Sequence, residues 1–131
     1  MIKIAVDAMG GDHAPPAIVD GAVGAARHLD LQLFLVGASA SIVPALERHA
    51  DWRELPIRIV EAPDVVEMAD AAAAARRKPG ASIRVAADLV VRHEADALFS
   101  AGHTGATVLA THLAFGMIPG VDRPALATAI P

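Results

Sequence analysis

Short, largely apolar runs alternate along the whole chain with segments whose apolar residues recur at helical spacing. The runs at residues 2–7, 31–36, 57–60 and 97–99 predict strands, and the continuous apolar run at 31–36 is typical of a strand covered on both faces. The segments between them repeat apolar residues at i, i+3 and i+4 and therefore predict helices. Strands that alternate with helices indicate an α/β fold with a mostly parallel sheet.

The predicted helices differ in their faces and starts. The first presents small residues that would pack closely on a sheet, and Ser39 or Ser41 could cap the second. Residues 70–77 predict a short alanine-rich helix, Ser82 could cap the next one, and residues 104–118 predict a long buried helix. The residues expected to face inward are Ile18, Gly21, Ala22, Ala25 and Ala26 in the first helix, Ile42, Ala45, Leu46 and Ala50 in the second, and Ile83, Ala86, Ala87, Val90 and Val91 in the fourth.

A fifth apolar run at residues 126–130 predicts another strand. Because the sequence stops at Pro131, where a core strand begins, residues 1–131 are expected to be the amino-terminal part of a single α/β domain. The chain shows no internal repeat, low-complexity tract or linker.

Composition narrows the possible chemistry. The chain is 54% hydrophobic, which is enough for one ordinary core, and its formal net charge of -4 gives no general reason to bind nucleic acid or an anionic membrane. It contains no cysteine, which excludes disulfides, thiolate nucleophiles and thiolate metal sites. No signal peptide is expected, and the longest apolar stretch, 105–119, is shorter than the ~20 residues of a membrane span.

The first loop with candidate chemistry follows the first predicted strand and contains Asp7, Gly10, Gly11 and Asp12. In an open α/β sheet, loops at the carboxyl ends of strands line the ligand crevice. The two glycines would let the backbone approach a ligand, and the carboxylates could orient a base or a bound water. The alternative is that the glycines only make a turn and Asp12 only caps it.

The second loop, SAGHTGA at residues 100–106, joins the fourth predicted strand to the following helix. Small residues, two glycines and the hydroxyls of Ser100 and Thr104 are typical of the N–H nests that hold phosphate. The alternative is that Thr104 merely caps the helix. No GxxxxGK[ST] or GxGxxG pattern occurs, so free phosphate is favoured over a nucleotide.

The densest basic cluster, Arg76-Arg77-Lys78, lies at a predicted helix end, where cations are favoured even without a ligand. Lys78 is the member expected to reach a cleft. The histidines lack the spacing of metal ligands, and only His103, inside the second loop, is a candidate to donate to an oxyanion or protonate a leaving thiolate.

Taken together, these segments resemble the phosphate acyltransferase family known as PlsX. The opening IAVDAMGGD at residues 4–12 is the most specific match. RRK at 76–78 with Ser82, SAGHTGA at 100–106 and GVDRPAL at 120–126 follow in the family's order and spacing. Departures are His103, where the family usually has Asn, one hydroxyl fewer after Lys78, and alanines at 71–75.

The resemblance implies a three-layer α/β/α fold similar to isopropylmalate dehydrogenase and phosphotransacetylase. It implies an enzyme more than twice as long as this chain, which forms acyl-phosphate from an acyl carrier protein thioester and inorganic phosphate in phospholipid biosynthesis. Such an enzyme is a cytoplasmic homodimer with peripheral membrane association, uses no cofactor or metal, and supplies a membrane acyl-phosphate:glycerol-3-phosphate acyltransferase.

Residue roles follow from this resemblance together with the loop patterns. Phosphate is already an anion and needs positioning more than activation, so Lys78 is assigned as its cation and His103 as a catalytic donor. Arg76 and Arg77 are expected to contact the acidic carrier protein. The phosphate and substrate pocket is predicted to comprise Asp7, Gly10, Gly11, Asp12, Ser100, Gly102, His103, Thr104 and Gly105.

Three other functions remain open at this point. A related acyl-phosphate/CoA transferase would use the same fold and loops. A metal-dependent dehydrogenase of similar fold is disfavoured, because the expected nicotinamide and metal ligands are not visible in the sequence. The chain could also be a non-catalytic binding or oligomerisation module.

Overall fold

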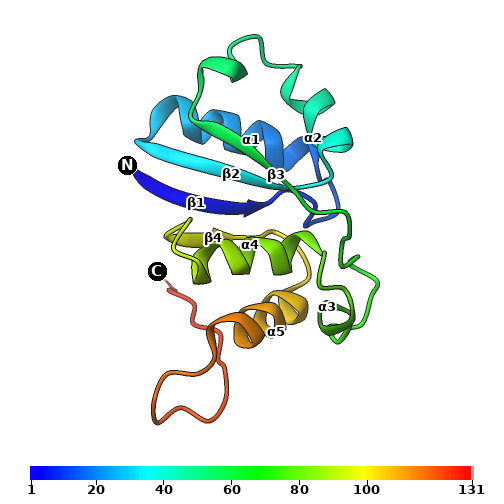
Figure 1. Cartoon of the computed structure of the whole chain (residues 1–131), viewed down its shortest axis with the longest axis vertical. Coiled ribbons are helices and arrows are strands. Elements are labelled where there is room, and N and C mark those ends of the chain that lie inside the picture. Colours follow the sequence, from blue (N-terminus) through cyan, green and yellow to red (C-terminus); the bar gives the residue numbers. More distant parts are fainter. Residues whose placement is uncertain (131) are drawn as a thin grey trace.

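The computed structural model describes residues 1–130 and contains one sheet of four parallel strands in the order β3-β2-β1-β4 (Figure 1). The four predicted strands are confirmed, as is the α/β fold. The strands are β1 (Ile2–Asp7), β2 (Leu31–Gly37), β3 (Ile57–Glu61) and β4 (Ala97–Phe99). The helices are α1 (Pro16–His28), α2 (Ser39–Leu46), the 3-10 turn η1 (Trp52–Glu54), α3 (Ala74–Arg77), α4 (Ser82–Val91) and α5 (Thr104–Phe115).

The central strand β1 determines where the chemistry can lie. It pairs with β2 from Ile2 opposite Leu31 to Asp7 opposite Val36, and with β4 on its other side, where Val6 lies opposite Phe99. Because all these strands are parallel, Asp7 and Phe99 end at the same edge of the sheet. The loops that follow β1 and β4 therefore start side by side.

Helices cover both faces of the sheet, because alternate strand residues point to opposite sides. On β2, Leu33 and Leu35 pack with α1 and α2, whereas Phe34 and Val36 pack against α4 on the other face. Figure 1 shows α1 and α2 on one side of the sheet and α4 on the other, with α3 and α5 beyond α4. The chain thus forms three layers, with an apolar core on each face of the sheet and a third apolar cluster between α3, α4 and α5.

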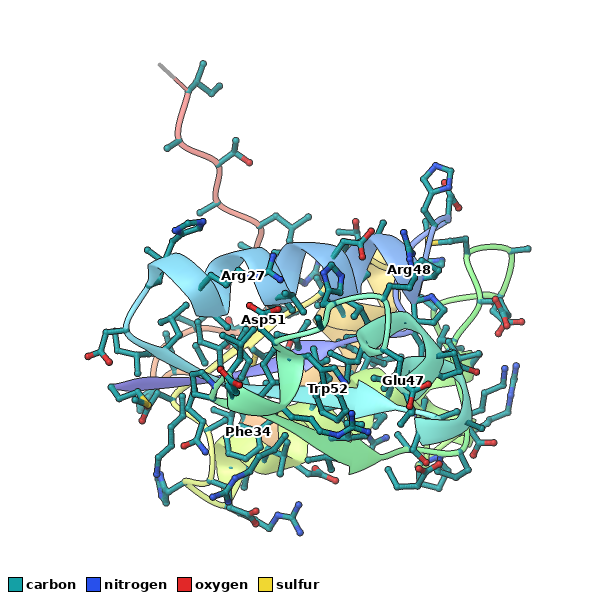
Figure 2. The ribbon with its side chains drawn as sticks, turned by 90° about the horizontal axis from the view of Figure 1, so that it is seen from above. Arg27, Phe34, Glu47, Arg48, Asp51 and Trp52 are labelled. Carbon is teal, nitrogen blue, oxygen red and sulfur yellow. The ribbon has the colours of Figure 1, made fainter. Side chains whose placement is uncertain are left out.

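Ion pairs at the surface tie the α1 layer together. Arg27 on α1 donates two hydrogen bonds to Asp51, which follows α2, and Figure 2 shows the two side chains facing each other. The Arg27 hydrogen bond holds the pKa of Asp51 below its usual value. Next to this pair, the Arg53 guanidinium lies 4.8 Å from the centre of the Trp52 ring.

The structure corrects the expected helix caps. Neither Ser39 nor Ser41 caps α2, because the residue before the helix is Ala38 and the Glu61 carboxylate accepts the Ser39 N–H at 3.0 Å instead. Hydrogen bonding by Ser39, through its side chain first and its backbone N–H second, lowers the pKa of Glu61. Ser82 does not cap α4 either, since Ala81 precedes the helix and Ser82 is its first residue. At both positions a long-range hydrogen bond forms in place of a local cap. The Ser39 N–H donates to Glu61, and the Ser82 hydroxyl donates to Asp7.

The inward faces are also partly rotated from those expected. In α1 the buried residues are Val19, Ala22, Val23 and Ala26, while Gly21 is exposed. In α4, Leu89 is buried and Val91 is 45% exposed. The second helix ends at Leu46, before Ala50. Hydrophobic spacing located the helices, although the one predicted at 70–77 forms only over Ala74–Arg77, and neighbouring elements decided which side of each helix is covered.

The carboxyl-terminal predictions differ most from the structure. The predicted fifth strand at 126–130 is not formed, because these residues pair with no strand. The predicted buried helix ends at Phe115 rather than 118, and only Ala106 and Ala110 of α5 are buried. An apolar helix needs neighbours on all sides to be buried, and residues 1–130 supply them on one side only.

Candidate functional site

The two glycine loops meet at the edge of the sheet where β1 and β4 end. A Cβ atom on Gly102 would lie 3.0 Å from the Gly10 Cα, and one on Gly11 would lie 3.1 Å from the Ala101 carbonyl oxygen. Both contacts involve backbone, so the loops touch directly. The expected convergence of the two loops at one edge of the sheet is therefore confirmed.

The glycines are needed for this packing. A Cβ on Gly10 would lie 2.5 Å from the Asp7 Oδ2 and 2.9 Å from the Ser100 Oγ, closer than side chains tolerate. Gly11 has a φ of +114°, a conformation that side chains other than glycine rarely adopt. The sequence suggested that these glycines make room for a ligand, whereas here they make room for each other's loop.

Asp7 lies at the centre of the contact and is only 4% exposed. Its Oδ1 accepts the hydroxyl of Ser82 at 2.6 Å and the Met9 N–H at 3.3 Å. Its Oδ2 accepts the hydroxyl of Ser100 at 2.8 Å, and the Ser100 oxygen in turn accepts the Gly102 N–H at 3.1 Å. One carboxylate thus links β1, the start of α4 and the second loop.

This arrangement restricts where an anion can bind. Within residues 1–130 no lysine, arginine or histidine forms an ion pair with Asp7. Two like charges 4 Å apart repel by about 4 kcal/mol at the effective dielectric typical near a protein surface. The Ser100 hydroxyl proton is also already donated to Asp7. An anion is therefore better accommodated on the outer side of the second loop than against Asp7 or Ser100.

The outer side of the second loop is the start of α5. His103 caps this helix, because its Nδ1 accepts the Ala106 N–H at 3.2 Å, so the cap is His103 rather than Thr104. An Nδ1 that accepts places the proton of the neutral ring on Nε2, which leaves Nε2–H as a donor. The N–H groups of Thr104 and Gly105 have no acceptor in residues 1–130. These donors make the helix start suitable for an anion.

A third segment, residues 64–72, forms the opposite wall of the site. A Cβ on Gly105 would lie 3.1 Å from the Ala72 Cβ, so this segment reaches the start of α5. It also faces the first loop across a pocket of about 410 Å³. Asp12 lines this pocket together with Met9, Gly11, Ala14, Val65, Glu67, Met68 and Ala69.

Lys78 is held behind this wall. Its Nζ donates to the Val65 carbonyl at 2.9 Å and to Asp70 Oδ2 at 2.8 Å, and its side chain is 38% exposed. The Lys78 hydrogen bond is the main cause that holds the pKa of Asp70 below its usual value. Arg76 and Arg77 lie exposed at the end of α3. Lys78 therefore lies beside the pocket wall and is paired with a carboxylate.

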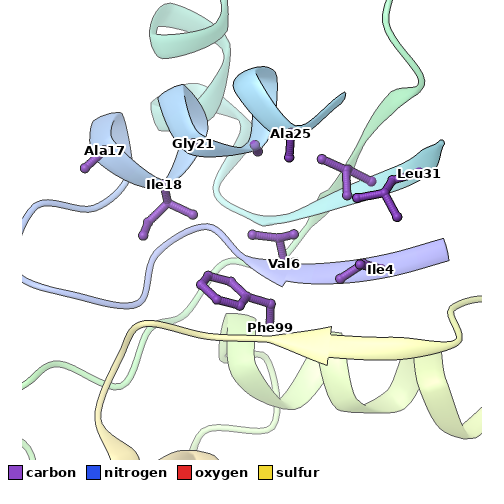
Figure 3. Close-up of a pocket in the computed structure, with 10 residues that line it drawn as sticks. Ile4, Val6, Ala17, Ile18, Gly21, Ala25, Leu31 and Phe99 are labelled. Atoms are coloured by element: carbon purple, nitrogen blue, oxygen red, sulfur yellow. The ribbon is translucent and has the colours of Figure 1, made fainter. Parts of the chain in front are cut away.

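An apolar groove lies on the α1 side of the sheet (Figure 3). It has a volume of about 340 Å³ and runs between α1 and the sheet, with Ile4, Val6 and Phe99 on the strands and Ile18, Gly21 and Ala25 on the helix. Phe99 is 53% exposed and immediately precedes Ser100. The face of α1 that the sequence marked for close packing thus borders this groove.

Sequence reasoning missed two members of the site. Ser82 was expected to be a helix cap, but it binds a carboxylate 75 residues away in sequence. Asp70, the partner of Lys78, carried no sequence signal beyond its negative charge. Across residues 1–130, no helix is long and apolar enough to cross a membrane, and no group of three or more potential ligands could hold a metal ion.

Comparisons with known proteins find relatives over nearly the whole chain. The model of a family described as "Fatty acid synthesis protein" matches residues 2–131. The chain is 50% identical over 129 residues to the phosphate acyltransferase of Synechocystis sp. (strain ATCC 27184 / PCC 6803 / Kazusa) and 48% identical over 129 residues to that of Crocosphaera subtropica (strain ATCC 51142 / BH68). Each alignment covers 98% of this chain and 37% of the relative. The chain thus spans little more than a third of the length of these relatives.

Proposed function

The chain belongs to the fatty acid synthesis protein family, and from this premise we propose that it is the amino-terminal part of a phosphate acyltransferase. The proposed reaction transfers an acyl group from the thioester of acyl carrier protein to inorganic phosphate. Support comes from curated relatives that carry the name phosphate acyltransferase and match nearly the whole chain. The same region contains two touching glycine loops at the carboxyl edge of a parallel sheet, where α/β folds place ligands.

In the proposed reaction, a phosphate oxygen attacks the thioester carbonyl carbon and forms a new C–O bond. The C–S bond breaks as the tetrahedral intermediate collapses, and the leaving thiolate takes a proton. Because phosphate is already an anion, the protein needs to position it and to stabilise the developing oxyanion. No serine or cysteine nucleophile is required, which fits a chain without cysteine.

The observation that carries the proposal is the set of donors at the start of α5 that have no acceptor among residues 1–130. The N–H groups of Thr104 and Gly105 and the Nε2–H of His103 would hold the phosphate. Gly10, Gly11 and Gly102 set the spacing of the loops that bring these donors to the first loop. His103 is also the group proposed to protonate the leaving thiolate, and the proton that its Nε2 gives up is replaced by the one that the attacking hydrogen phosphate loses.

Lys78 is proposed as the cation that accompanies phosphate into the pocket. Its ammonium binds the carbonyl of Val65, which lines the pocket beside the first loop. Arriving phosphate would compete with Asp70 for this ammonium, since both are anions. Arg76 and Arg77, exposed at the neighbouring helix end, would attract the acidic carrier protein.

The full-length enzyme is proposed to be a cytoplasmic homodimer that associates peripherally with the membrane. There it would supply acyl-phosphate to a membrane acyl-phosphate:glycerol-3-phosphate acyltransferase in phospholipid synthesis. A net charge of -4 gives no general attraction to nucleic acid, and the exposed Arg76 and Arg77 offer a local basic patch to an acidic protein partner.

The decisive experiment is an assay of the full-length enzyme with acyl carrier protein thioester and inorganic phosphate. Acyl-phosphate can be trapped with hydroxylamine, and free thiol is measured in parallel. We expect phosphate-dependent formation of both products in equal amounts. Acyl-CoA in place of the carrier thioester is the matched control, and a preference for acyl-CoA would instead identify an acyl-phosphate/CoA transferase. Failure to turn over either thioester would reject the proposal in favour of a binding module.

A further inference from the structure

We propose that Asp7 is a positioning residue, which fixes the phosphate-binding loop through Ser100 without contacting phosphate itself. This inference rests on the proposed function and concerns how its site is held together. It differs from the direct phosphate contact that the sequence suggested for Asp7.

Two consecutive hydrogen bonds connect Asp7 to the second loop through Ser100. Ser100 donates its only hydroxyl proton to Asp7 Oδ2 at 2.8 Å, so the Ser100 oxygen presents its lone pairs to the Gly102 N–H at 3.1 Å. Without the carboxylate, the hydroxyl could rotate and the Gly102 N–H would lose a defined acceptor. Asp7 therefore sets the conformation of the loop immediately before the donors of α5.

Asp7 is itself anchored at the start of α4. Its other oxygen accepts the Ser82 hydroxyl at 2.6 Å, and Ser82 is the first residue of the ten-residue helix α4. A carboxylate at a helix amino terminus is favoured by the helix dipole. Ser82 is 1% exposed, so this anchor lies in the core. Hydrogen bonds through Asp7 thereby fix the second loop to β1 and α4. A binding site supported by regular elements such as these is positioned more precisely than one supported by loops.

The two hydroxyl partners of Asp7 require a carboxylate at this position. Two hydroxyl groups donate to opposite oxygens of Asp7, and only a carboxylate offers two acceptor oxygens. Asparagine has nearly the same size but turns an NH₂ group toward one serine. Asp7→Asn therefore removes one of the two hydrogen bonds while preserving the volume of the side chain.

Burial and charge keep Asp7 out of direct contact with phosphate. Asp7 is 4% exposed and carries a negative charge, and its Oδ2 lies 2.5 Å from where a Cβ on Gly10 would be. The first loop therefore covers the carboxylate. An anion has neither access to Asp7 nor an attraction to it, so the influence of Asp7 must pass through Ser100.

The test uses Asp7→Asn, Ser100→Ala and the double variant in the full-length enzyme. We expect each single change to raise the KM for phosphate about tenfold, the cost of one well-placed hydrogen bond to the loop, while the KM for the thioester stays within about twofold. Residues that act through one chain of hydrogen bonds are not additive, so the double variant should match the more damaging single variant.

The control is Val23→Ala, which removes buried methyl groups from α1 and lowers thermal stability without touching either loop. Val23→Ala should leave the KM for phosphate unchanged even where its melting temperature falls as much as that of Asp7→Asn or Ser100→Ala. A wild-type phosphate KM in Ser100→Ala, full additivity in the double variant, or parallel increases in both KM values would overturn the positioning role. If the wild type fails to form acyl-phosphate, the proposed function is wrong. Calorimetric titration with inorganic phosphate then still tests whether Asp7 positions the loop. Weaker binding by Ser100→Ala than by the wild type would support the positioning role, and equal or absent binding would refute it.

Discussion

A methyl group added to Gly102 would test whether the two glycine loops must touch. The added Cβ would lie 3.0 Å from the Gly10 Cα and 3.2 Å from the Ser100 Oγ, so the neighbouring backbone must give way by a few tenths of an ångström. Backbone atoms yield less readily than the end of a flexible side chain. Overpacking of this kind typically costs about 1–3 kcal/mol of stability. Because the same shift moves the donors at the start of α5, we expect kcat/KM for phosphate to fall about 10- to 100-fold.

The assay compares Gly102→Ala with Gly24→Ala in the full-length enzyme. No atom lies within 4 Å of a Cβ on Gly24, which is in α1, so that variant should gain about 0.5–1 kcal/mol of stability and keep its kinetics. Stability is measured by urea denaturation, and kcat/KM from acyl-phosphate formation over a range of phosphate concentrations. If Gly102→Ala had wild-type kinetics, the loop contact would be irrelevant to the site.

Three further changes should have measurable effects. Lys78→Ala should raise the KM for phosphate severalfold. Asp70→Asn should lower this KM, because the Lys78 ammonium then loses the carboxylate that competes with phosphate. Equal KM values for these variants and the wild type in steady-state assays would show that Lys78 does not bind phosphate. Ser82→Val should lower the free energy of unfolding in urea by about 1–3 kcal/mol, since a buried carboxylate loses a hydrogen bond, and an unchanged denaturation midpoint would contradict this. The Arg27 hydrogen bond lowers the pKa of Asp51. The stability contributed by this pair is therefore present above the unfolded pKa of about 3.9 and is lost as pH falls through the folded pKa. Asp51→Asn should show a smaller loss of stability than the wild type between about pH 5 and 2, measured by thermal melts.

Much of the fold follows from local pattern. The four strands appear at the predicted positions because short apolar runs between segments of helical periodicity favour strands. The predicted strand at 126–130 did not form, because a strand needs a partner and its apolar pattern alone supplies none. Helix positions were likewise predictable, whereas helix ends and caps were not, as at Ala38 and Ser82.

The candidate site was predictable to a lesser extent. Glycines after two parallel strands indicated loops that would meet, and they do meet at Gly10 and Gly102. The partners of the polar groups were not predictable. Lys78 was expected in a cleft and is paired with Asp70, while His103 rather than Thr104 caps α5. Hydrogen-bond partners depend on distances between segments, and these distances are absent from a one-dimensional pattern.

The sequence by itself determined the order of strands and helices, the two glycine loops and the family. It could do so because hydrophobic periodicity and loop chemistry are local properties of neighbouring residues. The tertiary structure alone decided that β4 lies beside β1 and that Asp7 meets Ser82 and Ser100, residues 75 and 93 positions away. Such contacts arise only after the chain crosses the sheet and brings β4 next to β1. Only the folded chain therefore shows which donors already have acceptors among residues 1–130 and which are left to bind a ligand.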